Sequence, residues 1–480
     1  MAAAAAQLRT LLGSGRVVYG LNTGCGPLCD RAIPPDEGAQ FQLNLLRSHA
    51  SGLGAPLPAP VVRATMALRA YSLAQGRSAV RPVVVETLIA MLNADLVPVV
   101  PEMGSVGASG DLVELAHIAR ALTGEGTVSY QGRHQPAAAA FRAAGLRPVV
   151  PEGREALALM NGTACETAQA VLTLLGAERV LAAAEVAAAL VIEVFGGNPE
   201  SFDPRVHAAR AHPGQLETAA RLRRLLEGSA RLRDATSRGG PERGRTEPVQ
   251  EAYTLRCVPQ VLGAVRDALA YVRSVLTIET NAVTDNPVFF PEDDAVLHAG
   301  NFHGQPVAFA ADHLKLALAE IALFSERRLA RLLDPATNGG LPPFLIRDRI
   351  GIRSGLMGLQ YCASSTVAEN QVLATPASLA SVPTNANNQD VVGMGTVAAR
   401  QARRLLDNTR RVVAIELLAA AEAIDLVGPE GLSPATRAAH AAIRDLVAPL
   451  LEDRALGDDV ERLVSGLDAV VAAATTATAR

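Results

Sequence analysis

One short run of small residues combines side-chain and backbone groups that could do chemistry. Gly104–Asp111 reads GSVGASGD and precedes an apolar run over 112–122. In a tight bend, the amide nitrogen of Gly110 can attack the carbonyl carbon of Ala108, because glycine has no Cβ to crowd the approach. Ring closure releases one water, and loss of a second water from Ser109 leaves a methylene group that accepts nucleophiles. Ala108-Ser109-Gly110 could therefore become an electrophile made from the chain itself.

A simpler interpretation of the same run is a glycine-rich loop whose Ser109 or Asp111 caps the following helix. Two nucleotide-binding motifs do not fit. The glycines do not match GxGxxG, and no Gly-Lys-Ser/Thr follows as in a phosphate-binding loop. The sequence also shows no binding motif for an external cofactor, so the electrophile and the capped loop remain the two alternatives.

Six further short segments along the chain also carry polar, aromatic or glycine residues that could belong to a site. They are Tyr19–Gly24 (YGLNTG), Met160–Thr163 (MNGT), Gln250–Cys257 (QEAYTLRC), Thr284–Pro287 (TDNP), Gly300–Gly304 (GNFHG) and Asn388–Asp390 (NQD). Together with GSVGASGDL they resemble the signatures of lyases that carry a methylidene-imidazolone (MIO) group. That family comprises histidine, phenylalanine and tyrosine ammonia-lyases and related aminomutases, and the resemblance extends from about residue 15 to 420.

The resemblance implies removal of ammonia across the α and β carbons of an aromatic amino acid. It makes Tyr19 the base, whose pKa of about 10 the site would have to lower. Arg256 would bind the substrate carboxylate with its planar guanidinium, while Asn161 and Tyr253 would lie beside the MIO group and orient the amine. The remaining substrate contacts would come from Gln250, Asn286, Phe302 and Gln389. Taken singly, Arg256, Asn286 and Phe302 are typical of a surface ion pair, a turn and a core aromatic.

Histidine is the favoured substrate, and the products would then be urocanate and ammonia. Ser48-His49 resembles the selectivity position of histidine ammonia-lyases, and Glu369 also resembles their pattern. A carboxylate near an imidazole can hold its ring proton. By contrast, 387–392 (NNQDVV) is closer to phenylalanine lyases and bacterial aminomutases. Cys25 also replaces a usual phenylalanine, and Glu114 replaces a usual proline.

Three other functions stay open: a 2,3-aminomutase, a phenylalanine or tyrosine ammonia-lyase, and a catalytically silent helical assembly protein. The first two use the same residues and differ in product. The third predicts that Ser109 does not cyclise.

The elements that must position these residues are predicted to be mainly α-helical. Hydrophobic residues make up 49% of the chain and aromatic residues only 3%, with no tryptophan, so alanine, leucine and valine build the interior. Three-to-four periodicity predicts a long-helix bundle with a smaller, loop-rich α+β N-terminal portion. The predicted helices cover 168–175, 180–194, 258–279, 307–333, 357–373, 393–423 and the stretch beyond 433, and a small hairpin or irregular excursion is predicted over 124–136.

We expect three domains, at 1–150, 151–420 and 421–480, with a charged Gly/Pro-rich loop at 237–250. Helices this apolar need neighbours, which favours a homo-oligomer, and the family resemblance implies a tetramer.

Composition restricts the partners. The net charge is −4 with acids and bases mixed, which argues against nucleic acid. Five dispersed cysteines suggest neither disulfides nor a metal site and favour a reducing, cytoplasmic setting. The most apolar stretch, 172–195, carries charged residues and is therefore predicted to be a buried helix rather than a membrane span.

Overall fold

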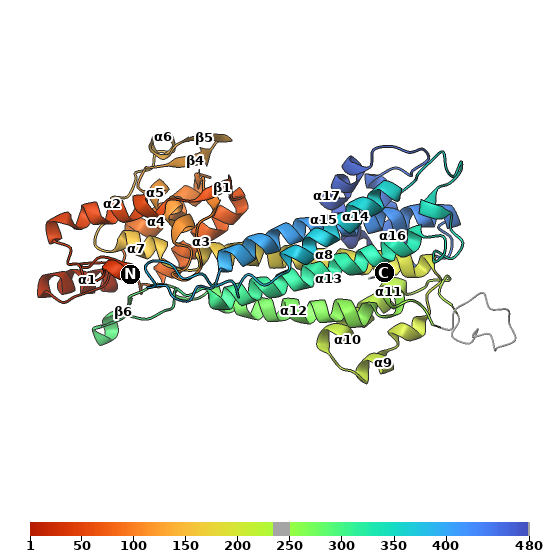
Figure 1. The fold of residues 1–480 in the computed structure, drawn as a ribbon, viewed down its shortest axis with the longest axis horizontal. Coiled ribbons are helices and arrows are strands. Elements are labelled where there is room, and N and C mark those ends of the chain that lie inside the picture. The colour runs from red at the N-terminus through yellow and green to blue at the C-terminus, as the bar shows by residue number, and fades with distance from the viewer. Residues whose placement is uncertain (234–249, 479–480) are drawn as a thin grey trace. The chain divides into compact units, whose positions relative to one another are not determined.

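The computed structural model describes residues 1–233 and 250–478, which are mostly helical (Figure 1). All but the last residue of the predicted charged loop at 237–250 lie outside the described residues. Contacts divide the chain into two units. Unit 1 consists of Met1–Thr173, Val272–Asp312 and Pro376–Arg403, and unit 2 of Leu174–Tyr271, His313–Thr375 and Arg404–Arg480. The predicted boundaries at residues 150 and 420 stay a prediction.

Unit 1 is built from short helices and small sheets. Its helices are α1 (Ala2–Ser14), α2 (Gly38–His49), α3 (Ala59–Ala74), α4 (Pro82–Asn93), α5 (Leu112–Leu122), α6 (Ala137–Ala143) and α7 (Glu155–Met160). Proline stands in the first turn of α3 and α4, where its missing N–H costs nothing. Leu46, Met66, Leu88 and Phe141 are among the buried residues of a core that α2 to α7 share.

Three small antiparallel sheets complete unit 1. β2 (Val97–Pro98), β4 (Thr127–Tyr130) and β5 (Arg133–Pro136) form one sheet, β1 (Leu53–Pro56) and β3 (Pro101–Met103) a second, and β6 (Val288–Phe290) and β7 (Ala295–Leu297) a third. β4 and β5 pair from Thr127–Pro136 to Tyr130–Arg133, which confirms the predicted hairpin.

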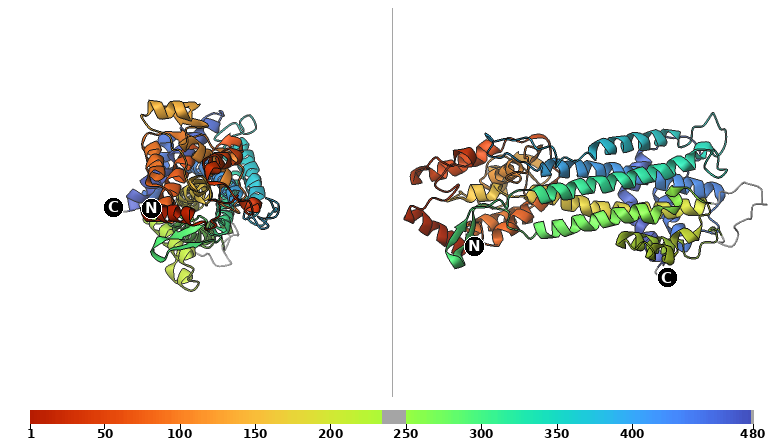
Figure 2. Two further views of the ribbon diagram at one scale, coloured as in Figure 1. Left: turned by 90° about the vertical axis from the view of Figure 1, so that its left-hand side faces the viewer. Right: turned by 60° about the horizontal axis from the view of Figure 1, so that its bottom comes forward.

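The long helices match the predicted ones. They are α8 (Ala164–Val194), α12 (Val258–Glu279), α13 (Gln305–Leu333), α14 (Met357–Leu373) and α15 (Gly395–Val427). Their stretches within unit 2 run side by side as a bundle (Figures 1 and 2). α8 is buried over most of its circumference, as expected for a helix that is apolar on every face.

Several charged side chains cross the interior of the bundle in unit 2. Arg328 of α13 pairs with Glu416 of α15, and both side chains are fully buried. Glu185 of α8 is paired with Arg221 and Arg266, at 2.7 Å in each case. Buried ions require such partners, because an unpaired charge in a low-dielectric interior is strongly unfavourable.

The rest of unit 2 consists of α9 (Pro204–Ala208), α10 (Pro213–Leu226), α11 (Tyr253–Arg256), α16 (Pro434–Leu446) and α17 (Gly457–Thr478). None of the helices among residues 1–233 and 250–478 has the length and hydropathy that a membrane crossing requires.

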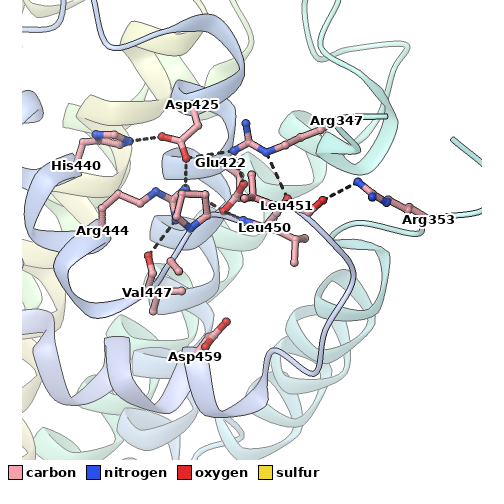
Figure 3. A network of polar contacts seen from close by, with 12 residues as sticks. Arg347, Arg353, Glu422, Asp425, His440, Arg444, Val447, Leu450, Leu451 and Asp459 are labelled. Carbon is pink, nitrogen blue, oxygen red and sulfur yellow. Dashed lines mark hydrogen bonds and ion pairs between the residues drawn. The ribbon is translucent and has the colours of Figure 1, made fainter. Parts of the chain in front are cut away.

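A polar network joins the C-terminal end of α15 to α16 and to the loops around it (Figure 3). The buried carboxylate of Glu422 lies 3.0 Å from Arg347 and 2.9 Å from Arg444. It also accepts a hydrogen bond from the backbone N–H of Leu450 at 2.9 Å. Asp425 extends the network to the ring of His440 at 2.7 Å. Glu422 therefore pairs with both arginines and satisfies one backbone donor, while Asp425, at 3.2 Å from Arg347 and 3.0 Å from Arg444, supplies the second negative charge.

We expect Glu422→Gln to lower the free energy of unfolding by about 3 kcal/mol, because it leaves Arg347 and Arg444 with less buried negative charge. The measurement is urea unfolding followed by circular dichroism. Glu430→Gln makes the same change at an exposed position and should have little effect. Equal stability of the two variants would show that the network does not stabilise unit 2.

Candidate active site

The loop that carries Ala108-Ser109-Gly110 lies between β3 and α5, and distant segments of unit 1 hold it in place. The N–H of Gly304 donates to the carbonyl of Gly107 at 2.9 Å, and the N–H of Met394 donates to the carbonyl of Val106 at 2.8 Å. The N–H of Asp111 donates to the carbonyl of Gly162 at 2.8 Å. Two predicted motif segments, 160–163 and 300–304, therefore contact this loop through the backbone, as does Met394, which follows the motif 388–390.

Gly110 occupies a position that only glycine fits. Its φ is +70°, in the left-handed region. A Cβ built there would lie 2.0 Å from the carbonyl oxygen of Gly162, well inside contact distance. Glycine is therefore required at 110 by the close approach of the Gly162 backbone.

Two amide side chains bind Ser109. Gln389 donates from Nε2 to the Ser109 hydroxyl oxygen at 2.9 Å, and Asn161 donates from Nδ2 to its carbonyl oxygen at 3.2 Å. The Oδ1 atom of Asn161 is buried and makes no hydrogen bond within the described part of the chain. A buried acceptor without a donor is unfavourable, so Asn161 is suited to receive an N–H from a bound group.

Asp111 does not cap the helix that follows it. α5 begins after Asp111 without a side-chain capping bond. Its Oδ2 atom instead accepts from the N–H groups of Cys165 and Glu166, at 2.7 and 3.0 Å, at the start of α8. The capped-loop interpretation is therefore wrong for Asp111, because the free N–H groups it satisfies belong to a different helix. Burial, followed by the charge of Glu114, raises the pKa of Asp111 well above its usual value.

Two further buried acids lie around the loop. Glu114 accepts from the Ser105 hydroxyl, whose oxygen in turn accepts from the N–H of Val113 at 3.0 Å. Glu166 is fully buried, and a Cβ on either Gly304 or Gly395 would lie 1.8 Å from one of its oxygens. Burial raises the pKa of both carboxyls. Sequence reasoning singled out Glu114 only as an unusual residue and missed Glu166, which looks like an ordinary helical glutamate.

A cavity of about 470 Å³ opens beside this loop within unit 1. Of the residues predicted from sequence, Tyr19, His49, Ser109, Asn161 and Gln389 all line it. Its other polar lining side chains include Cys25, Ser48 and Asn388, which were already named from the sequence, and Arg31, Asn44 and Asn385, which sequence reasoning did not single out. The cavity is large enough for an amino acid.

The Tyr19 side chain is held by its own loop. Its hydroxyl oxygen accepts a hydrogen bond from the N–H of Gly26 at 2.7 Å. Burial, followed by the nearby Cys25, raises the pKa of Tyr19 to about 12. A base would need a lowered pKa, as the sequence analysis required, so the shift of the Tyr19 pKa is in the opposite direction. Within unit 1, no cation lies close enough to Tyr19 to offset the effect of burial.

His49 is the last residue of α2 and presents its ring to the cavity. Its Nδ1 atom lies 2.9 Å from the carbonyl oxygen of Leu45 and 3.1 Å from the Ser48 hydroxyl. A carbonyl oxygen only accepts, so Nδ1 carries the proton in that contact. In the neutral ring with this tautomer, the Nε2 atom is an acceptor.

The other predicted residues do not line this cavity. In unit 1, the side-chain oxygen of Asn286 accepts from the N–H of Ala299 at 2.8 Å, and Phe302 is half-buried. The remaining four, which are Gln250, Tyr253, Arg256 and Glu369, belong to unit 2.

Three of the four, Tyr253, Arg256 and Glu369, have partners within unit 2. The Arg256 guanidinium lies over the Tyr253 ring at 4.7 Å, and the Tyr253 side chain is 68% exposed. Glu369 pairs with Arg404 at 3.2 Å and accepts from Asn408 at 2.8 Å.

The comparisons with known proteins show the family of the chain. The family model for aromatic amino acid lyases matches residues 1–445. The chain therefore belongs to the aromatic amino acid lyase family.

Two curated relatives are histidine ammonia-lyases. That of Symbiobacterium thermophilum is 50% identical over 463 residues, covering 96% of this chain and 89% of the relative. That of Geobacillus kaustophilus is 48% identical and covers 95% and 88%.

Solved structures extend the likeness to the fold. Tyrosine aminomutase from Streptomyces globisporus has a TM-score of 0.93 at 39% identity, covering 100% of this chain and 93% of that one. Histidine ammonia-lyase from Trypanosoma cruzi has a TM-score of 0.90 at 34% identity, covering 99% and 88%.

Proposed function

We propose that this chain is a histidine ammonia-lyase, a carbon–nitrogen lyase that converts histidine to urocanate and ammonia. The observation that carries the proposal is the shared cavity, which brings Tyr19, His49 and Asn161 together beside Ser109. The two histidine ammonia-lyases that are 50% and 48% identical over nearly the whole chain support the same substrate.

The prosthetic group would be MIO, formed from Ala108-Ser109-Gly110. The residues present fit this group for two reasons. Gly110 has no Cβ between its backbone and Gly162, and the buried Asn161 Oδ1 has no hydrogen-bond donor within the described residues. When formed, MIO supplies an electrophilic carbon that makes the substrate amine a better leaving group. Gln389 and Asn161 would hold the group in place, and Asn161 would also orient the amine.

Tyr19 would remove the β proton of the substrate as a tyrosinate. Its hydroxyl already accepts from the N–H of Gly26 at 2.7 Å, a contact that favours the ionised form. Burial nevertheless raises the pKa of Tyr19 to about 12. A cation that unit 1 does not supply would therefore have to lower this pKa. Arg256 would supply the contact to the substrate carboxylate, and that carboxylate would also place the β carbon opposite the base.

Completion of the site would require an oligomer, for which we propose a tetramer. Family resemblance implies active sites that combine loops from three subunits. The exposure of Tyr253 and its stacking with Arg256 on unit 2 support such a role. The five cysteines are free thiols, which favours a reducing, cytoplasmic setting.

The reaction is tested by incubating the protein separately with histidine, phenylalanine and tyrosine while recording ultraviolet absorbance and free ammonium. Histidine should give an absorbing acrylate together with ammonium. A β-amino acid product without free ammonium would instead identify a 2,3-aminomutase. That second candidate is favoured by the run at 387–392 and by the 39% identity to a tyrosine aminomutase.

His49 should determine the substrate, because its Nε2 acceptor matches the ring N–H of histidine and phenylalanine has no such donor. We expect His49→Leu to change the ratio of kcat/KM for histidine over phenylalanine by about 10²-fold in favour of phenylalanine. Glu369→Gln should shift the ratio in the same direction. Histidine turnover that is untouched in both variants would contradict the assignment of these residues while leaving the reaction class intact.

A further inference from the structure

A second cavity, of about 240 Å³, borders the loop that carries Ala108-Ser109-Gly110. It lies within unit 1, as does the 470 Å³ cavity described above. The two cavities share five lining residues, which are His49, Ser109, Leu112, Asn385 and Gln389. Ser109 therefore borders both spaces. The larger cavity contains the residues assigned to the substrate, whereas the smaller one has no role in the reaction proposed above.

The wall of the smaller cavity carries no permanent charge. Among the described residues that line it there is no aspartate, glutamate, lysine or arginine. An amino acid bound there would leave its carboxylate without a cation, which is unfavourable. Two polar side chains line this cavity alone, Ser105 and Thr384. The Ser105 hydroxyl is already used, because it donates to Glu114 and accepts from the N–H of Val113. The wall therefore suits a small, neutral, hydrogen-bonding molecule.

The smaller cavity extends from Ser109 to an exposed turn. Thr384 and Gln389 close this turn through their backbones, with N–H to carbonyl distances of 3.1 and 3.3 Å. Both residues line the cavity, and every residue from 384 to 388 is exposed. A molecule released beside Ser109 therefore has a short way to the surface on this side.

We propose that the smaller cavity receives the ammonia that the elimination releases and conducts it to solvent while the aromatic product still occupies the larger cavity. The proposal rests on the proposed function, in which histidine loses ammonia beside Ser109. Ammonia is uncharged when it leaves the substrate, and it is close in size to a water molecule, whose share of liquid volume is about 30 Å³. The uncharged wall and the volume of the smaller cavity both suit it.

A separate way out for ammonia also determines which product forms. In the elimination the bond between nitrogen and the α carbon breaks, its electron pair stays on nitrogen, and the β proton goes to Tyr19. Ammonia that stays beside the product can form a bond to the β carbon while the α carbon takes a proton. That return gives the β-amino acid isomer of histidine. Removal of ammonia through the smaller cavity prevents the return, so the chain releases ammonia instead of acting as an aminomutase.

Thr384→Trp places a large side chain at the outer end of the smaller cavity, and it leaves the backbone pairing with Gln389 possible. The measurement is the amount of ammonium, urocanate and β-amino acid formed from histidine. We expect kcat for ammonium release to fall by about tenfold, because release becomes the slow step, and the β-amino acid fraction to rise. Thr384 does not line the larger cavity, so competitive inhibition by urocanate should be unchanged. The intact mass should still show the loss of two waters.

Val382→Trp is the matched control. It introduces the same side chain two residues earlier, at a position that is 63% exposed and lines neither cavity. It should release ammonium at the wild-type rate. Equal rates and equal product ratios in Thr384→Trp and Val382→Trp would overturn the proposal.

A second measurement depends neither on turnover nor on the prosthetic group. It uses Ser109→Ala, which cannot form the electrophile, and methoxyamine, a small amine that is uncharged near neutral pH and has a methyl group. With urocanate present at saturation, we expect nuclear magnetic resonance to show saturation transfer from the protein to these methyl protons. Adding Thr384→Trp should abolish the transfer.

Transfer that disappears when urocanate is added would place the amine in the larger cavity and overturn the proposal. Transfer that survives Thr384→Trp would overturn it as well. The proposed function fails separately, if the wild type forms no ammonium from histidine, and the methoxyamine measurement still tests the smaller cavity in that case.

Discussion

Ser109→Ala is expected to reduce ammonia release from histidine by at least ~10³-fold, the order of loss seen when a covalent catalytic group is removed. Alanine has no hydroxyl to lose as water, so the methylene group cannot form. The Ser109 side chain is bound only by Gln389 within the described part of unit 1, and its removal should leave the packing intact. The measurements are ammonium release and the far-ultraviolet circular dichroism spectrum.

Ser105→Ala is a control on the same loop. Ser105 also loses a hydroxyl, but that hydroxyl binds Glu114 and the N–H of Val113 and does not line the 470 Å³ cavity. It tests whether loss of any loop hydroxyl is enough to stop turnover. Turnover by Ser109→Ala within tenfold of the wild type would refute an electrophile at this position.

Tyr19→Phe is expected to lower kcat by about 10²- to 10⁴-fold, the usual contribution of a positioned acid or base. Phenylalanine keeps the ring but has no oxygen to accept from Gly26 or to take the β proton. The effect should be on kcat more than on KM, since proton removal follows binding. Single-turnover kinetics with β-deuterated histidine would check whether proton removal has become slower.

The two substitutions should be separable by mass. Ser109→Ala should keep the mass calculated from its sequence. Tyr19→Phe should still form the MIO group and be lighter than its sequence mass, because Tyr19 contacts the loop that carries Gly26 and not the tripeptide. Wild-type rates in Tyr19→Phe would show that another group removes the proton.

Much of the fold could be predicted because its signals are local. The apolar periodicity of 258–279 and 357–373 gave helices whose ends agree with α12 and α14. The turn residues around Gly132 gave the β4–β5 hairpin. In such segments a few neighbouring residues determine the backbone conformation.

The candidate site could be predicted in part for a different reason. The reactivity proposed for Ala108-Ser109-Gly110 depends on the order of three residues, and in the structure Gly110 has a positive φ, which favours glycine. The contacts that each side chain makes were harder to predict from the sequence. Asp111 precedes α5 in the chain but binds the start of α8, 54 residues further on.

Long-range packing accounts for the residues that were missed. Glu166 becomes a buried acid only because Gly107, Gly304 and Gly395 meet around it, and no local pattern predicts that meeting. The rise in the Tyr19 pKa likewise depends on burial within the cavity.

The most direct measurement is the intact mass of the purified wild-type chain, with the peptide that contains 104–113 isolated to locate any change. We expect the chain to be lighter than its sequence mass by two water molecules, with the whole loss in that peptide. A wild-type chain that is active yet has its full sequence mass would contradict a self-formed electrophile at Ala108-Ser109-Gly110.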